Sequence, residues 1–343
     1  MSLTLSGFTN SVSHGDSEVK PARQGRSRIS TEASLIQIER LRKCYDSLVA
    51  VDDISFNVHD GEIFGLLGPN GAGKTTTINM ICGVLQPDGG KVLVDDRNIW
   101  IEPKKVKRHL GVVPQEIAVY EDLTARDNLR FWGSLFGLSG TELSQRVNES
   151  LNGVGLAERA GDKVKTFSGG MKRRLNLCMG LLHRPKFLLL DEPTVGIDPQ
   201  ARLNILDVIR EAADAGTTVL YTTHYMDEAE QLCDRIAIID HGKILAIGTL
   251  AELTKRAGEA EVLRLTGPFD DESLRARLSA IPGTRILRVG EGTAVLAIES
   301  DGPGLLDILP RVLDEELGVE DVSIQRPNLQ SVFIALTGRE LRD

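Results

Sequence analysis

Gly68-Pro69-Asn70-Gly71-Ala72-Gly73-Lys74-Thr75 is the segment with the clearest chemistry in this 343-residue chain. It matches the pattern GxxxxGK(S/T), and it lies between an apolar run at residues 62–67 and a helix-forming run at residues 76–82. A loop between a strand and a helix is the setting that this pattern requires. Its glycines let successive backbone N–H groups point inward without Cβ clashes, and the following helix adds a partial positive charge. The segment is therefore predicted to bind phosphate.

Two side chains at the end of this loop have specific predicted roles. Lys74 supplies a full positive charge to the β- and γ-phosphates of a nucleotide, and the Thr75 hydroxyl is a predicted Mg²⁺ ligand. We expect the nucleotide contacts to extend from the loop to Thr76, where the helical run begins.

A second signal lies at Asp191 and Glu192, which directly follow the apolar run at residues 187–190. A buried strand that delivers an acid at its carboxyl end suits Mg²⁺ coordination, and we assign this role to Asp191. Glu192 is then placed to polarise an attacking water as a general base. Beside a phosphate loop, this pair predicts nucleotide hydrolysis.

Composition and charge exclude several classes of protein. Hydrophobic residues make up 41% of the chain and charged residues 26%, which is typical of a folded domain. The formal net charge of −9 argues against a bulk nucleic-acid binder. The chain contains no apolar run as long as the roughly 18 residues of a membrane span. Its four cysteines form no CxxC pair, so zinc binding has no support and buried thiols in a reducing cytosol are expected.

The order of strand and helix signals predicts an α/β fold in three parts. Residues 1–33 are polar and lack apolar periodicity, so a disordered tail is expected there. Strands and helices alternate over residues 34–255, with a helical insertion at about 124–165 that begins with a capping pattern at Thr124 and Asp127. Residues 256–343 restart with the order β-α-β-β-α-β, which predicts a small α+β accessory domain of ferredoxin-like topology.

A family resemblance rests on Ser168-Gly169-Gly170, between Phe167 and Met171. Here the chain resembles ATP-binding cassette (ABC) ATPases, whose signature reads LSGGQ. The resemblance implies a P-loop NTPase fold with a RecA-like core, a β subdomain and a helical insertion. It also implies that the three signature residues contact the γ-phosphate held by the opposite subunit, although Met171 cannot make the contacts of the usual Gln side chain.

The other motifs of the family follow in its order. Gln115 matches the Q-loop glutamine, which contacts Mg²⁺ and water and senses the membrane subunit. Asp198 matches the D-loop, which contacts the other subunit, and His224 matches the switch histidine at the γ-phosphate. Tyr45 stands where the family places an aromatic ring that stacks on adenine.

Basic residues 172–174 lie in the predicted helix after the signature. A solvated helix face is expected for them rather than a nucleic-acid site, since basic residues are common here in the family.

The C-terminal sequence, at Pro327–Phe333 and Leu336–Arg339, is similar to one ABC subgroup that contains daunorubicin-type drug-resistance exporters. This similarity implies a homodimer, or a dimer with a close paralogue, joined to a separate ABC-2-type membrane permease. The ATPase would then lie at the cytoplasmic face of the inner or plasma membrane. The cargo stays open among drugs, lipids, polysaccharides and lipo-oligosaccharides.

The resemblance implies an ATPase mechanism with ATP and Mg²⁺, catalytic Lys74, Gln115, Glu192 and His224, and dimer closure that drives export. The alternative is a soluble non-transport ABC ATPase in DNA repair, translation or regulation. Such chains usually carry two cassettes, long coiled coils or zinc cysteines, and this sequence shows one cassette without the other features.

Overall fold

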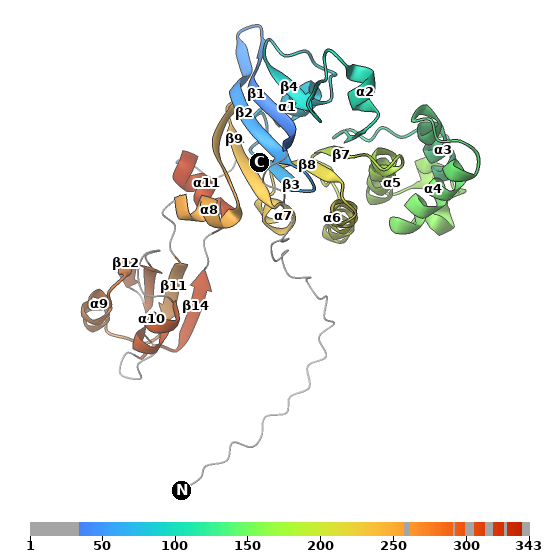
Figure 1. Ribbon diagram of the computed structural model, residues 1–343. Coiled ribbons are helices and arrows are strands. Elements are labelled where there is room, and N and C mark those ends of the chain that lie inside the picture. Colours follow the sequence, from blue (N-terminus) through green and yellow to red (C-terminus); the bar gives the residue numbers. More distant parts are fainter. Residues whose placement is uncertain are drawn as a thin grey trace.

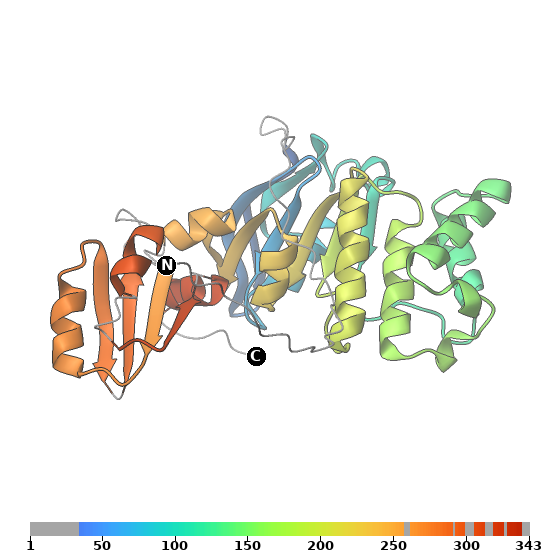
Figure 2. The same cartoon turned by 90° about the horizontal axis from the view of Figure 1, so that it is seen from below.

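The computed structural model describes residues 34–256, 261–290, 292–298, 305–312, 318–325 and 328–337. The predicted polar tail at residues 1–33 lies outside the described residues. We refer to residues 34–256 as the core region and to residues 261–325 as the C-terminal unit. The C-terminal unit lies at one end of the molecule and helices α3 and α4 at the other (Figures 1 and 2).

The core region is built on a central sheet of six described strands in the order β10-β9-β3-β8-β7-β6. These strands are β3 (Ile63–Leu67), β6 (Leu110–Val113), β7 (Phe187–Asp191), β8 (Thr218–Thr223), β9 (Arg235–Asp240) and β10 (Lys243–Gly248). All pairs except β9–β10 are parallel. Every residue of β3, β7 and β8 is buried, as expected for parallel strands covered on both faces.

A second, antiparallel sheet covers one side of the core region (Figure 1). It has the order β2-β1-β4-β5 and contains β1 (Ser34–Tyr45), β2 (Leu48–His59), β4 (Gly89–Val94) and β5 (Arg97–Asn98). Its apolar side chains share one hydrophobic cluster with the central sheet, and the rings of Phe56 and Phe64 stack with centroids 5.2 Å apart. Helices α1 (Lys74–Ile81) and α2 (Pro103–Lys107) complete this part.

The remaining helices of the core region follow the sheet strands. They are α3 (Ala125–Leu135), α4 (Gly140–Gly153), α5 (Gly169–Leu181), α6 (Pro199–Asp214), α7 (Met226–Leu232) and α8 (Leu250–Arg256). The predicted helix start at Thr124 is confirmed, because its side chain accepts a hydrogen bond of 3.0 Å from the Asp127 N–H. Leu129, Val147 and Leu175 join α3, α4 and α5 into a separate apolar cluster. This part of the chain therefore has a core of its own beside the central sheet.

The C-terminal unit has its own antiparallel sheet. Its elements are β11 (Glu261–Thr266), α9 (Asp271–Ser279), β12 (Thr284–Gly290), β13 (Thr293–Ile298), α10 (Leu305–Val312) and β14 (Asp321–Gln325). The strands lie in the order β12-β13-β11-β14. Leu265, Leu278, Leu296 and Ile308 belong to one buried cluster between this sheet and its helices.

The last described helix, α11 (Leu329–Thr337), departs from the predicted domain boundary near residue 255. It lies beside α8 of the core region in both views (Figures 1 and 2). Leu329, Val332 and Phe333 are buried in a cluster with Ala229 of α7 and Leu253 of α8. The assignment of all residues after 256 to the accessory domain is therefore wrong for α11, because its apolar face completes a core cluster between α7 and α8.

Within the part of the chain that the structure describes, no helix combines the length and the hydropathy that crossing a bilayer requires.

Candidate active site

Parallel pairing of three neighbouring strands brings the predicted site residues to one edge of the central sheet. Strands β3 and β7 both pair with β8, with Leu67 opposite Thr223 and Asp191 opposite Thr222. The carboxyl ends of parallel strands lie at the same edge of a sheet, which is where α/β proteins bind ligands. The phosphate loop after β3, Glu192 after β7 and His224 after β8 therefore converge.

The loop after β3 has the backbone that its glycines predict. Gly73 has a φ of +104°, and a Cβ there would lie 2.5 Å from the carbonyl oxygen of Ala50. A Cβ on Gly68 would lie 2.2 Å from the carbonyl oxygen of Ile239. These close approaches allow only glycine at both positions. Lys74 folds back into the loop, where its Nζ donates to the carbonyl oxygens of Gly68 at 2.7 Å and of Pro69 at 2.9 Å.

Buried contacts through Glu192 connect the three strand ends. Lys74 Nζ lies 2.9 Å from Glu192 Oε1, and His224 Nδ1 lies 3.1 Å from Glu192 Oε2. The side chains of Lys74 and Glu192 are only 4% and 5% exposed, so water screens their attraction poorly. Glu192 has a φ of +44°, a left-handed backbone that is uncommon for a residue with a side chain and is concentrated at functional sites. The sequence-predicted lysine, glutamate and histidine therefore form one unit.

Asp191 is held by Thr222, a residue that the sequence did not single out. The Thr222 hydroxyl donates to Asp191 Oδ1 at 2.8 Å and accepts the Glu192 N–H at 3.0 Å. Burial raises the pKa of Asp191, and hydrogen bonds from the side chains of Thr222 and Thr75 oppose part of this rise. The contact with Thr75 joins two of the predicted metal ligands.

A pocket of about 350 Å³ opens beside the phosphate loop. Predicted residues in its wall are Tyr45, Asn70, Gly71, Gly73, Lys74, Thr75, Thr76, Gln115 and Glu192. Sequence reasoning missed four others: Leu48, Val49, Ala50 and His241. The Tyr45 ring is 45% exposed and so can offer a face to a planar base. The missed residues follow Tyr45 or lie in the distant β9–β10 turn, and no motif marks them.

The predicted signature residues lie elsewhere. Among the described residues that form the pocket wall, Ser168, Gly169 and Gly170 do not occur. Ser168 is the N-cap of α5 and accepts the Met171 N–H at 3.3 Å. Asp198 is the N-cap of the neighbouring α6, and a Cβ on Gly170 would lie 3.8 Å from Asp198 Oδ2. The predicted signature and D-loop residues are therefore neighbours, away from the phosphate loop of their own chain.

Comparison with known proteins decides the family. Residues 51–195 match the family described as ABC transporter. The chain is 44% identical over 311 residues to the linearmycin resistance ATP-binding protein LnrL of Bacillus subtilis, covering 90% of this chain and all of the relative. It is 42% identical to the daunorubicin/doxorubicin resistance ATP-binding protein DrrA of Streptomyces peucetius, over 90% of this chain and 94% of the relative. The chain belongs to the ABC transporter ATP-binding proteins.

Solved structures agree with this assignment. An ATP-binding subunit of an ABC transporter has 31% identity and a TM-score of 0.61, covering 66% of this chain and 94% of that one. A dimeric ATP-binding cassette in a post-hydrolysis state, bound to ADP and Pi, has 26% identity and a TM-score of 0.58, covering 62% of this chain and 98% of that one. The present ABC protein is thus an ATPase whose hydrolysis of ATP is coupled to transport, and the non-transport alternative is not favoured.

One expectation about the ABC signature helix is wrong. Arg173 does not belong to a solvated face, because it is 5% exposed and lies within the cassette. Its Nη1 donates to the carbonyl oxygen of Gln115, and its Nη2 donates to that of Val195 at 3.1 Å. Burial lowers the pKa of this guanidinium. Arg173 therefore ties α5 to the Gln115 loop and to the loop that precedes Asp198, which a run of basic letters does not reveal.

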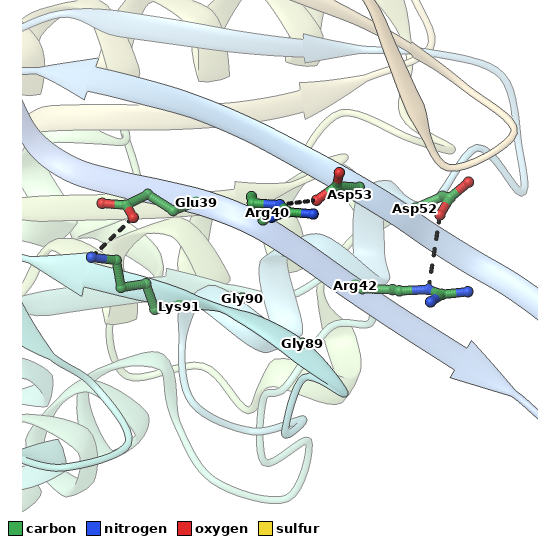
Figure 3. Close-up of a pocket in the computed structure, with 8 residues that line it drawn as sticks. All are labelled: Glu39, Arg40, Arg42, Asp52, Asp53, Gly89, Gly90 and Lys91. Carbon is green, nitrogen blue, oxygen red and sulfur yellow. Dashed lines mark hydrogen bonds and ion pairs between the residues drawn. The ribbon is translucent and has the colours of Figure 1, made fainter.

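A second hollow of the cassette, of about 620 Å³, lies on the outer sheet over β1, β2 and β4 (Figure 3). Its charges are already matched in ion pairs: Lys91 with Glu39 at 2.9 Å, Arg40 with Asp53 at 3.1 Å and Arg42 with Asp52 at 3.8 Å (Figure 3). Exposed pairs of this kind each contribute less than about 1 kcal/mol. This hollow therefore offers no excess of positive charge to an anion.

Proposed function

We propose that this chain is the ATP-hydrolysing subunit of an exporter and works as a homodimer, or with a close paralogue, on a separate ABC-2-type membrane permease. The main support for a dimer is that Ser168–Gly170 lie apart from the pocket beside Lys74 on the same chain. A second copy in the opposite orientation would supply the missing signature to each pocket. The dimeric form of a structural relative supports this arrangement.

The site residues divide the proposed reaction among them. ATP would draw Lys74 from its ion pair with Glu192 toward the β- and γ-phosphates, since the phosphates carry more negative charge. The freed Glu192 carboxylate would accept a proton from the attacking water. His224 would stay near Glu192 and donate a hydrogen bond to the γ-phosphate oxygen where charge develops. Gln115 would orient the water from the pocket wall.

The residues fit a magnesium ion that completes its shell with nucleotide and water. Asp191 and Thr75 offer the oxygen ligands that Mg²⁺ prefers, and Gln115 adds an amide oxygen from the pocket wall. The described ranges contain no group of three or more His, Cys, Asp or Glu side chains that could hold a metal alone. When bound, the ion would neutralise charge on the β- and γ-phosphate oxygens.

An apolar groove of about 340 Å³ is the proposed docking surface for the permease. Val112, Trp132, Phe136 and Met179 line it, and Pro114 places it next to the Gln115 loop. Val84 at its edge is 74% exposed. A patch of exposed apolar side chains usually marks a surface where a partner binds. A short apolar helix on the cytoplasmic side of the permease would fill this groove. Closure at the ATP site would then reach the membrane through Gln115.

We propose that the C-terminal unit is a ferredoxin-like accessory domain, which its strand order β12-β13-β11-β14 supports. The names of relatives support export of drug-like molecules, since both LnrL and DrrA are named for antibiotic resistance. The permease would select the cargo.

Mixing two inactive variants tests the dimer. Glu192→Gln removes the base from one chain, and Gly169→Asp blocks the signature of the other. In a mixed dimer, the phosphate loop of the second chain meets the signature of the first, so one complete site returns. The mixture should therefore hydrolyse ATP faster than either variant alone. No recovery in a mixture whose subunit exchange is verified by differently tagged chains would exclude sites shared between subunits.

The docking surface has its own test. Val112→Asp or Phe136→Asp should abolish co-purification with a co-expressed ABC-2-type permease, while ATP binding is retained. Leu287→Asp is the control, because Leu287 is 50% exposed on the C-terminal unit. Loss of binding in the control alone would move the docking surface to that unit.

A further inference from the structure

A buried carboxylate, Glu228, lies in the first turn of α7, just after His224, and has no role in the proposed reaction. Its side chain is 2% exposed. Oε2 accepts hydrogen bonds from the Tyr221 hydroxyl at 2.7 Å and from the Thr223 hydroxyl at 2.8 Å. Burial of a carboxylate costs solvation free energy, which its contacts must offset. The contacts of Glu228 therefore indicate its role.

The partners of Glu228 flank the switch histidine. Thr223 directly precedes His224, and its hydroxyl also accepts the Tyr225 N–H at 2.9 Å. Tyr221 lies on β8, and its hydroxyl is 3.4 Å from the hydroxyl of Thr194, in the loop that follows Glu192. Glu228 therefore fixes the backbone on both sides of His224.

The other oxygen of Glu228 faces a different helix. Arg202 of α6 places its Nε 3.3 Å from Glu228 Oε1. The guanidinium also lies over the ring of Tyr225, 4.4 Å from the ring centroid. Because Asp198 is the N-cap of α6, Arg202 connects the predicted D-loop to both sides of the histidine that acts on the γ-phosphate.

The ion pair is close but incomplete. Neither Arg202 Nε nor Glu228 Oε1 completes a hydrogen bond with any of the described residues, although both atoms are buried. A buried pair at this distance gains from a small shift that aligns donor and acceptor. Movement of α6 is one such shift, and it would be transmitted to Thr223 and Tyr225.

We propose that Arg202 and Glu228 are positioning residues that form a joint between α6 and the switch histidine. The inference rests on the proposed function, in which Asp198 contacts the opposite subunit and His224 contacts the γ-phosphate. Arrival of the opposite subunit at Asp198 shifts α6, and the joint sets the position of the His224 ring in the same chain. Occupancy of one site thus controls catalysis at the other.

The test measures kcat and KM for ATP in the full chain. Glu228→Gln and Arg202→Gln should each lower kcat about tenfold with KM changed less than twofold, since only the catalytic position of His224 is disturbed. The double variant should be no slower than either single variant, because the two residues act through one contact. Arg202→Lys should restore part of the rate by keeping the charge. Glu211→Gln is the control on the same helix, because Glu211 is exposed and lines a hollow that contains no described residue of α7.

The outcomes separate the joint from a structural role and from the proposed function. Single-variant losses that multiply in the double variant, or a kcat no lower than that of the control, would overturn the joint. Glu228→Gln could slow the enzyme by destabilising the fold, which a lower thermal midpoint would reveal. In that case the comparison of Arg202→Gln with Arg202→Lys tests the joint, because Arg202 is 29% exposed and its substitution does not disturb the core. If Glu192→Gln hydrolyses ATP at the parent rate, the proposed chemistry fails rather than the joint.

Discussion

The phosphate loop and the signature turn are both glycine-rich segments ahead of a helix, yet the chain builds them in opposite ways. The phosphate loop is enclosed, with Lys74 4% exposed and Cβ positions on Gly68 and Gly73 blocked by backbone. The signature turn faces outward, and a Cβ on Gly169 would have nothing within 4 Å. The contrast fits the proposed dimer, in which one loop holds a nucleotide and the other is presented to the opposite subunit.

The ionisable side chains of the site are also divided unequally between the two loops. Lys74, Glu192 and His224 all lie on the phosphate-loop side, whereas Ser168–Gly170 contribute one hydroxyl and backbone N–H groups. In the proposed function, chemistry belongs to the enclosed half and its activation to the open half. Each of the following changes tests this division.

The largest effect is expected for Glu192→Gln on the enclosed half. Turnover should fall by a factor of about 10² to 10⁴, because the amide cannot accept the proton of the attacking water. ATP affinity should be retained or increased, since Lys74 loses its competing carboxylate. Single-turnover hydrolysis and equilibrium binding of ATP measure the two quantities. Hydrolysis at the wild-type rate would remove Glu192 from the reaction.

A smaller loss is expected for Gly169→Asp on the open half. The new carboxylate fits sterically but would face the γ-phosphate of the opposite subunit, so turnover should fall about a hundredfold, as when one donor to a developing charge is lost. The affinity of a single chain for ATP should stay within about twofold.

Gly161→Asp is the matched control for this change, because a Cβ there also has nothing within 4 Å. An equal loss of turnover in the control, or a loss of ATP affinity with Gly169→Asp, would contradict the assignment of the signature to the open half.

The smallest effect concerns the stability of the half that presents the signature. His183 stacks on Phe136 at a centroid distance of 3.7 Å, and burial lowers its pKa from 6.5 to about 4. Between these values the unfolded chain binds a proton that the folded chain does not. The free energy of unfolding should therefore fall as the pH drops from 6.5 toward 4.

Thermal unfolding across this pH range measures the effect. His183→Gln removes the titrating group and should flatten the dependence. His241→Gln is the control, because the His241 side chain is 74% exposed and lies in the turn between β9 and β10. An unchanged slope in His183→Gln would assign the acid sensitivity to other groups.

The sequence predicted those parts of the site that motifs mark by type and order. Local patterns predict the phosphate loop, Asp191 and Glu192. In each case the glycines or acids directly follow an apolar strand in the sequence. Thr222 and Arg173 were missed because their roles depend on neighbours far away in the chain, at Asp191 and Gln115. Spacing in a sequence does not reveal such contacts until the strands are paired.

The C-terminal part shows the same limit at the level of the fold. Alternation and turn residues predicted the order of strands and helices in the C-terminal unit, and β11 (Glu261–Thr266) follows such an alternation. The return of α11 to the core region was not foreseen, since an apolar helix face does not specify which apolar surface it covers. The position of α11 is set by the apolar surface between α7 and α8.

The position of α11 also has a consequence for the order in which the protein is made. The groove that receives Leu329, Val332 and Phe333 is formed by α7, α8 and β9, all of which leave the ribosome well before α11 does. Residues 257–328 must be synthesised while this apolar groove faces solvent. A nascent or truncated chain therefore displays the kind of surface that chaperones and proteases recognise. Helix α11 covers this groove only after the entire C-terminal unit has been synthesised, so the apolar core of the cassette is completed late in synthesis.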